Sequence, residues 1–256
     1  MTKNALNICL ATSALFLPLY LWRSTYPSSD WAVLAFLPLS VMLFFGYLSL
    51  SAAIFRARFR AAVRAGSPLM SILSGRIRAI SGALIFVLIS IPLLAWQALV
   101  SSLSEILILI ALGVLSGGLF AGLKLKFLPH FHQPFANAVA ISIGTWIAAA
   151  AFIPIIAWMN WYYVSYPGEI RTASLPEAVM QGLQELPPRR GWIAEILAPM
   201  YAYEAGKLWA VVQLGSSKWS TILFSLDTAL VSFIIARSSI VLTLLAQTLD
   251  RDNEAA

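Results

Sequence analysis

The stretch FANAVAISIGTWIAAAAFIPIIAW, residues Phe135 to Trp158, decides the fold, because its 24 residues include no charged side chain. An α-helix needs about 20 mainly apolar residues to cross a hydrocarbon core about 30 Å thick. Inside a bilayer such a helix also satisfies its own backbone hydrogen bonds. The stretch is therefore predicted to be a transmembrane helix.

Five further apolar stretches lie along the chain, which has 256 residues and is 60% hydrophobic and 11% charged. An ordinary soluble domain has about 25% charged residues, so this composition disfavours a soluble enzyme and a disordered protein. We predict an all-α, polytopic integral membrane protein with one transmembrane domain over residues 1–256. Its six predicted spans are Leu6–Trp22, Trp31–Ile54, Ile80–Val100, Leu103–Leu123, Phe135–Trp158 and Ser220–Leu242.

The basic residues predict how these helices are oriented. The connection at residues 55–79 has six arginines and no acidic residue, and Lys124 and Lys126 precede another connection on the same side. Basic residues accumulate in cytoplasmic loops, so we expect both connections and both termini to lie in the cytoplasm, with the protein in the inner membrane. The candidates for docking or lipid contact are Arg56, Arg60, Arg64, Arg76 and Arg78, and the sixth arginine of the connection is Arg58.

Residues 161–217 form the longest connection on the exterior side. Ser174 and Glu177 mark a helix start there, and an apolar stripe follows as far as Pro187. Trp192–Leu214 is apolar enough to be a seventh span, but it contains two glutamates and a lysine. Each such charge costs about 2.5–3.5 kcal/mol near the centre of a membrane helix. We predict an amphipathic exterior segment, with a seventh span as the alternative.

Three acidic or basic side chains in the spans are candidates for transport or gating. Asp227 and Arg237 lie about 15 Å apart along one helix, so moving either out of the hydrocarbon pushes the other deeper. They lie on different helical faces and are poor partners for each other. The alternative is that each reaches an interface or pairs with a neighbouring subunit. Glu105 is the third candidate, and Ser102 three residues earlier gives it the spacing of a capping box.

Small residues predict close helix packing. Gly113, Gly117, Gly118 and Gly122 have the spacing that lets two membrane helices approach each other, in the same chain or in two chains. A proline followed four residues later by a tryptophan also recurs near the ends of three spans, which indicates duplicated hairpins or a chance spacing. The three pairs are Pro18 and Trp22, Pro92 and Trp96, and Pro154 and Trp158.

Residues that hold metals or cofactors are scarce. The chain has one cysteine, Cys9, and two histidines, His130 and His132, which lie on a short loop. This set argues against a metal centre or a haem, so we predict no metal and no cofactor. Neither a phosphate-binding P-loop nor a Gly-x-Ser-x-Gly or His-Glu-x-x-His motif is present. We therefore predict no catalytic residues and no enzyme activity.

Together these features predict a non-catalytic, membrane-embedded subunit of a multi-protein transport or channel complex. The expected partners are anionic lipid headgroups, other membrane subunits or further copies of the chain, and a cytoplasmic partner at the basic loop. The net charge of +6 reflects membrane topology, so nucleic acid is not an expected partner. Two alternatives stay open. One is a structural or interaction protein, such as an oligomerising effector or immunity component, and the other is a lipid-modifying membrane enzyme.

Overall fold

The structure, a computed structural model, describes the backbone of most of the chain. The described ranges are residues 3–62, 75–163, 172–184, 191–214 and 218–255. Side chains are described over the same ranges except at residues 59–62, 160–163, 218–225, 227 and 251–255.

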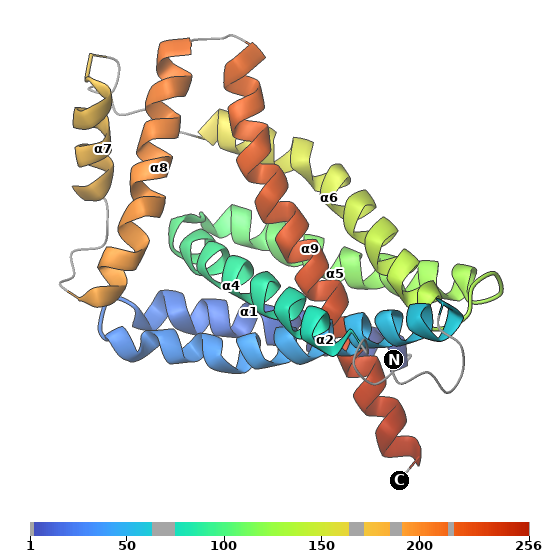
Figure 1. Cartoon of the computed structure of the whole chain (residues 1–256). Helices are drawn as coiled ribbons and strands as arrows, with labels where there is room; N and C mark the ends of the chain where they lie inside the picture. Colours follow the sequence, from blue (N-terminus) through green and yellow to red (C-terminus); the bar gives the residue numbers. More distant parts are fainter. Residues whose placement is uncertain (1–2, 63–74, 164–171, 185–190, 215–217, 256) are drawn as a thin grey trace.

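These ranges are helical almost throughout, and they include eight α-helices and one short 3-10 helix (Figure 1). The helices are α1 (Lys3–Thr25), η1 (Asp30–Ala35), α2 (Phe36–Ala62), α4 (Arg76–Val100), α5 (Leu103–Phe127), α6 (Phe135–Tyr163), α7 (Leu175–Gln184), α8 (Trp192–Leu214) and α9 (Lys218–Ala255).

Six of the described helices are long and apolar enough to cross a membrane, which confirms the predicted all-α, polytopic fold. They are α1, α2 with η1, α4, α5, α6 and the Thr228–Asp250 part of α9. The predicted Ser220–Leu242 span lies within α9, whose side chains at 218–225 and 227 are outside the described residues. Trp192–Leu214 is not among the six, although it forms one continuous helix.

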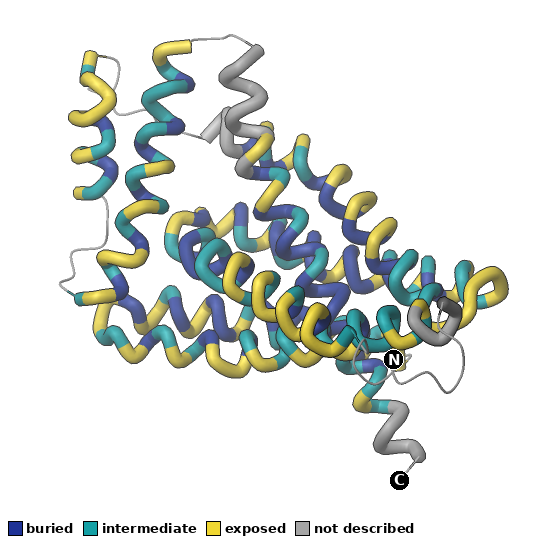
Figure 2. The backbone as a smooth tube through the Cα atoms, in the orientation of Figure 1, coloured by how far each residue is buried: buried dark blue, intermediate teal, exposed yellow. Residues whose placement is uncertain are grey.

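The long helix α9 is the centre of the bundle. It crosses the other helices obliquely and packs against α1, α2, α4, α5, α6 and α8 (Figure 1). Its middle is the most continuously buried part of the molecule (Figure 2), and two-thirds of its membrane-spanning window is buried, against 28–39% in the other five helices. Helix α9 is therefore the element whose side chains are most enclosed by protein.

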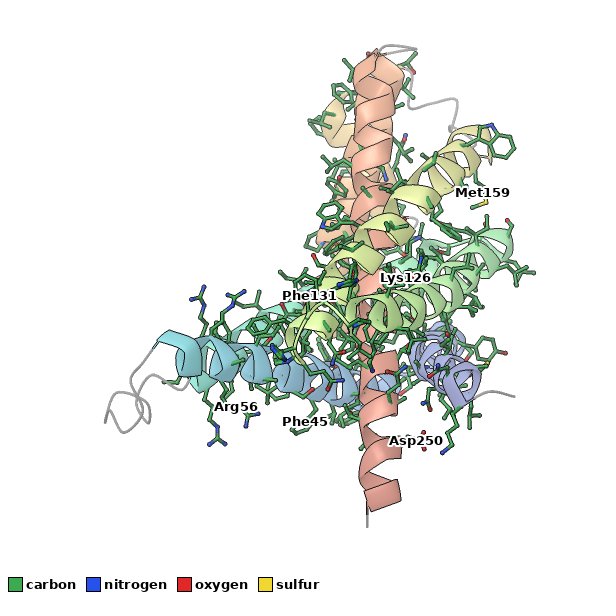
Figure 3. All side chains as sticks on the ribbon, turned by 90° about the vertical axis from the view of Figure 1, so that its right-hand side faces the viewer. Phe45, Arg56, Lys126, Phe131, Met159 and Asp250 are labelled. Carbon is green, nitrogen blue, oxygen red and sulfur yellow. The ribbon has the colours of Figure 1, made fainter. Side chains whose placement is uncertain are left out.

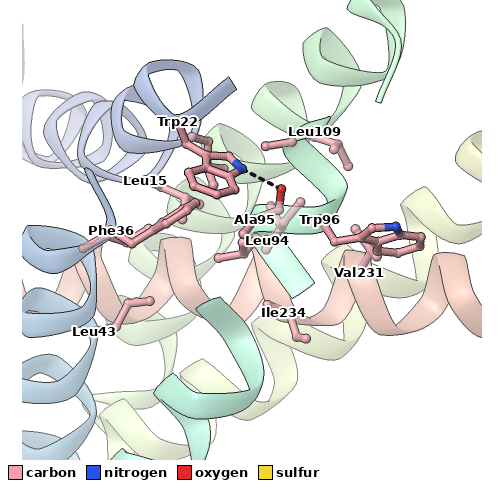
Figure 4. Packing of buried hydrophobic residues seen from close by; sticks show 14 of the residues in the cluster. Leu15, Trp22, Phe36, Leu43, Leu94, Ala95, Trp96, Leu109, Val231 and Ile234 are labelled. Atoms are coloured by element: carbon pink, nitrogen blue, oxygen red, sulfur yellow. Dashed lines mark hydrogen bonds between the residues drawn. The ribbon is translucent and has the colours of Figure 1, made fainter. Parts of the chain in front are cut away.

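A large apolar core is formed where α1, η1, α2, α4 and α9 pack against one another. Trp22 of α1 packs against Tyr26 and Phe36, and its indole Nε1 donates a hydrogen bond of 3.0 Å to the carbonyl oxygen of Ala95 in α4 (Figure 4). Trp96 is also buried in this core, beside Val231 of α9. The three tryptophans of the proline–tryptophan pattern differ in environment, because Trp158 is 64% exposed while Trp22 is 1% exposed.

Helices α7 and α8 lie side by side at the end of the bundle opposite both termini (Figure 1). Helix α8 runs across the direction of α1 and α5 instead of along it. The two helices approach closely at Gly182, where an added Cβ would overlap the Cβ of Ala205. Trp209 Nε1 also donates to the Ala173 carbonyl at 2.9 Å. An α7–α8 pair therefore forms most of the described part of the predicted exterior segment.

The basic connection is helical at both of its described ends. Helix α2 continues to Ala62, beyond the predicted end of its span at Ile54, and α4 begins at Arg76 after Gly75. Gly75 has a φ of +67°, and an added Cβ would lie 2.7 Å from Phe55 Cβ, so a side chain there would be both strained and crowded. Arg78 then lies over the Phe55 ring at 5.2 Å, which ties the two helix ends together.

Candidate functional site

Hydroxyl and amide side chains form a polar stripe on one face of α9. Thr228, Ser232, Ser239 and Thr243 fall within an arc of about 60° at 3.6 residues per turn, and all four are buried. The stripe faces α5, because Ser239 Oγ donates to the Gly113 carbonyl at 2.6 Å. It covers most of the Thr228–Asp250 span. Polar groups therefore line the best-enclosed helix over much of its membrane-spanning length.

Arg237 lies on the opposite face of α9, within the apolar Thr228–Asp250 part of the helix. Its guanidinium carbon is 5.6 Å from the centre of the Tyr47 ring in α2. One turn earlier, the Phe233 ring packs edge to face against the Trp146 ring of α6, with 5.2 Å between the ring centroids. This face of α9 is therefore bordered by α2 and α6.

The Arg237 guanidinium has no acceptor in the described part of the chain. It makes no hydrogen bond and no ion pair there, and the Tyr47 ring is its contact. Tyr47 in turn stacks on Phe86 of α4, with 5.0 Å between the ring centroids. Arg237 as a whole residue is partly exposed. A charged group at this depth with only a ring for a partner is energetically costly.

Asp227 and Arg237 both lie in α9, ten residues apart. The side chain of Asp227 is outside the described residues. Its predicted role in transport or gating stays a prediction.

Glu105 closes the turn between α4 and α5. Its backbone N–H donates to Ser102 Oγ at 3.2 Å, and its carboxylate is hydrogen-bonded to the backbone of Ser102, as a capping box requires. Gln97 Nε2 donates to Glu105 Oε1 at 2.7 Å and to Ser101 Oγ at 2.8 Å. Gln97 and Ser102 thus both donate to the buried Glu105 side chain, and its candidate role in transport or gating stays a prediction.

The predicted glycine surface divides into two faces of α5. An added Cβ at Gly113 would lie 3.1 Å from Phe16 of α1, and one at Gly117 would lie 3.0 Å from Thr243 Oγ1 of α9. These two glycines therefore let α5 pack between α1 and α9. Gly118 and Gly122 point the other way, and nothing lies within 4 Å of an added Cβ at either position. They border a shallow groove between α1 and α5.

Lys124 is a buried residue that the charge pattern did not single out as a site. The sequence places it at the end of a span beside a loop, but its side chain is 6% exposed. Lys124 Nζ donates to Gln247 Oε1 of α9 at 2.6 Å and lies 5.7 Å from the Phe120 ring. Gln247, four residues after Thr243, continues the polar stripe toward this lysine. Only the tertiary contact between α5 and α9 reveals this pair.

The arginines of the basic connection do not gather into one site. Arg56 and Arg58 are exposed near the end of α2, and Arg56 projects away from the bundle (Figure 3). Arg76 and Arg78 are exposed at the start of α4. The Arg60 side chain and all of Arg64 lie outside the described residues. The exposed arginines are accessible to lipid headgroups or to a partner, and binding of either one stays a prediction.

The start of α7 offers a pH-dependent contact. The backbone N–H and the hydroxyl of Ser174 donate to Glu177 Oε2 at 2.7 and 2.8 Å. Both bonds favour the charged carboxylate, so they hold the pKa of Glu177 below its usual value of 4.5.

Because the folded-state pKa of Glu177 is lowered, its contribution to the stability of α7 is present above pH 4.5 and is lost as the pH falls through the folded pKa. We expect hydrogen exchange at residues 172–180, corrected for intrinsic rates, to speed up on acidification through this window. The variant Glu177→Gln should lack that pH dependence. An identical acid response in the variant would contradict the assignment to Glu177.

Histidine and cysteine side chains stay dispersed. His130 and His132 are exposed in the turn between α5 and α6, and Cys9 is exposed on α1. Among the residues that the structure describes, no three of His, Cys, Asp and Glu lie together in a group that could hold a metal ion. The predicted lack of a metal stays a prediction.

The fold defines the class of this chain as an all-α, multi-pass membrane protein. Comparisons with protein families, with curated proteins and with solved structures found no match to it.

Proposed function

We propose that this protein is a non-catalytic, membrane-embedded subunit of a multi-protein transport or channel complex in the inner membrane, with both termini in the cytoplasm. The observation that carries the proposal is Arg237, a charged residue inside the apolar, membrane-spanning part of α9 without a hydrogen-bond acceptor in the described part of its own chain. An ionisable residue at that depth is a functional-site hypothesis by default.

The cost of burying Arg237 in hydrocarbon, compared with the small contribution of its ring contact, favours a partner from another subunit. An arginine at the centre of a membrane helix costs about 2.5–3.5 kcal/mol even on the most lenient scales. A ring contact such as that with Tyr47 contributes about 0.5–2 kcal/mol. A carboxylate on a neighbouring transmembrane helix would supply both the opposite charge and acceptors for the five guanidinium N–H donors. The partner we propose is therefore a membrane helix with an Asp or Glu at the depth of Arg237.

The polar stripe of α9 supports transport as the task of the assembly. Buried polar groups are costly in hydrocarbon and mark pathways for polar solutes. The hydroxyl of Ser232 in this stripe is buried and has no hydrogen-bond partner among the described residues. In this structure α5 packs closely against α1 and α9 at Gly113 and Gly117, and this packing covers the stripe. Passage along it would require α5 and α9 to separate, as in a gated subunit.

The second candidate is a structural or interaction protein that assembles from copies of this chain. The exposed pair Gly118 and Gly122 favours it, because these residues leave a groove between α1 and α5 into which a further helix would fit. In that case the acceptor for Arg237 would come from a copy of the same chain.

A photo-cross-linking amino acid at Leu230 tests the proposal in native membranes. Leu230 is 42% exposed and lies two turns from Arg237 on the same face of α9. We expect a cross-link to a different membrane protein that carries a transmembrane acidic residue. The control is the same probe at Leu107 of α5, which is 61% exposed and should react with lipid.

Three results of this experiment separate the candidates. A cross-link from Leu230 to a transporter or channel component supports the proposed function. A cross-link to a second copy of the chain replaces it with the oligomer. Reaction with lipid alone at both positions would overturn both candidates, because Arg237 would then have no protein partner.

A further inference from the structure

A cavity of about 540 Å³ lies between α1, α4 and α5, with Ile235 of α9 also among its lining residues. Its walls are almost entirely apolar and include Phe16, Leu94 and Leu109. Its volume is within the range of about 300–1,000 Å³ found for ligand pockets. Leu94 and Leu109 lie in the same packed region as Trp22 (Figure 4). The cavity is thus shaped by the main core of the bundle.

The polar groups of the cavity gather near the ends of α1 and α4. Arg23, Gln97 and Ser101 lie there. The Arg23 guanidinium is held in place, because Nη1 donates to the carbonyl oxygens of Ala98 at 3.2 Å and Ser101 at 2.5 Å. These carbonyls belong to the end of α4, where the helix itself leaves acceptors unused. Arg23 is therefore a fixed cation at the edge of an apolar space.

The remaining donors of Arg23 are available to a ligand. Both described hydrogen bonds use Nη1, and Nη2 and Nε have no partner in the described part of the chain. Glu105 is near this region, but no ion pair joins it to Arg23, and its carboxylate already accepts bonds from Gln97 and Ser102. The positive charge of Arg23 is therefore not neutralised by an acidic side chain in the described part of the chain, and an anionic ligand would neutralise it.

The length of the cavity matches one leaflet of a bilayer. Along α1 its lining residues run from Ser13 to Arg23, which is about 15 Å of helix. That is about half of a hydrocarbon core of about 30 Å. Arg23 is also two residues from Thr25, the last residue of the α1 span, and the polar headgroup layer lies beyond the end of a membrane-spanning helix. The cavity thus has apolar walls about as long as one leaflet and a cation at one end. This arrangement matches a phospholipid, whose acyl chain is joined through glycerol to a headgroup phosphate.

We infer that this cavity binds an anionic phospholipid, with one acyl chain between α1, α4 and α5 and the headgroup phosphate on Arg23. The guanidinium fork suits a phosphate because it can present two N–H groups to two oxygens. The apolar walls exclude water from the chain, and each buried methylene contributes to binding. This inference does not depend on the proposed function, since it involves a different face of the molecule from Arg237.

Native mass spectrometry of the full-length protein in detergent tests the inference. The probes are phosphatidylglycerol and phosphatidylcholine with identical acyl chains, and inorganic phosphate as a competitor. We expect one tightly retained phosphatidylglycerol. Arg23→Gln should weaken its retention by about tenfold or more, because a charge-assisted hydrogen bond is removed. Ile110→Trp, which fills the cavity without changing the charge, should weaken it comparably.

The control variant Lys126→Gln removes one positive charge from an exposed position on α5 that does not line this cavity and should retain the tight lipid. A thermal unfolding profile for each variant establishes that it is folded. Loss of the lipid in both Arg23→Gln and Ile110→Trp, with retention in the control, supports the site. Equal binding of the two lipids, retention in either cavity variant, or displacement by millimolar phosphate would each overturn it.

Discussion

Replacing Arg237 with leucine is expected to break the association of this chain with its partner subunit while the chain itself stays folded. Removing one member of a buried ion pair costs about 3–5 kcal/mol, because the other charge remains without compensation. This corresponds to an association weakened by more than about 100-fold. Within the described part of its own chain, the substitution removes the cation–π interaction with the Tyr47 ring. Pull-down from mild detergent, quantified against total protein, measures the effect.

Two further variants make that result specific to charge. Arg237→Lys keeps the positive charge but loses the planar fork, so it should retain part of the association. Tyr47→Phe keeps the ring face and should have a small effect. We also expect the isolated Arg237→Leu chain to be at least as heat-stable as the wild type, because a costly charge leaves the apolar interior. Unchanged pull-down with Arg237→Leu would contradict the role of this arginine.

Gly117→Leu should destabilise the bundle more than a change at any other glycine of α5. A Cβ there would lie 3.0 Å from Thr243 Oγ1 and 3.1 Å from Ile8 Cγ2, and the rest of a leucine side chain needs still more room. Overpacking of this kind costs about 1–3 kcal/mol, occasionally more, because helices must move apart. Here α5 would separate from both α1 and α9. A lower Tm in detergent, followed by light scattering, is the measurement.

The neighbouring residue provides the matched control. Gly118→Leu makes the same chemical change one position along the same helix, where nothing lies within 4 Å of an added Cβ. We expect its Tm to stay close to that of the wild type. Equal losses of stability in the two variants would show that the general helix properties of glycine, and not the packing of α5 against α1 and α9, set the result.

The spans were predictable because hydrocarbon accepts only long apolar helices. The uncharged run from Phe135 to Trp158 falls within α6, and the capping spacing of Ser102 and Glu105 gave the start of α5 correctly. Helix α9 is longer than a bilayer is thick, so the length of the helix alone does not set the bounds of the last span, predicted over Ser220–Leu242. Hydropathy alone does not say which part of such a helix the neighbouring helices bury.

The candidate site was predictable in its residue types but not in its contacts. Arg237 stood out because a charge in an apolar run is rare, yet nothing in the sequence pointed to the Tyr47 ring nearly two hundred residues away. Lys124 was missed because the end of a span ordinarily places a lysine in water or among headgroups. The cavity edged by Arg23 was missed because it is formed by three helices, each of which has an ordinary sequence there.

The sequence by itself determined the number of spans, their approximate limits and the clustering of basic residues, because these depend on local composition and on the thickness of a bilayer. The tertiary structure decided which polar groups are enclosed. It turned one face of α9 toward the glycines of α5, left Arg237 beside Tyr47, and kept Gly118 and Gly122 open. Side chains on one helix acquire such partners only when other helices pack around it. For that reason the contacts that point to function could not be predicted from the order of residues along the chain.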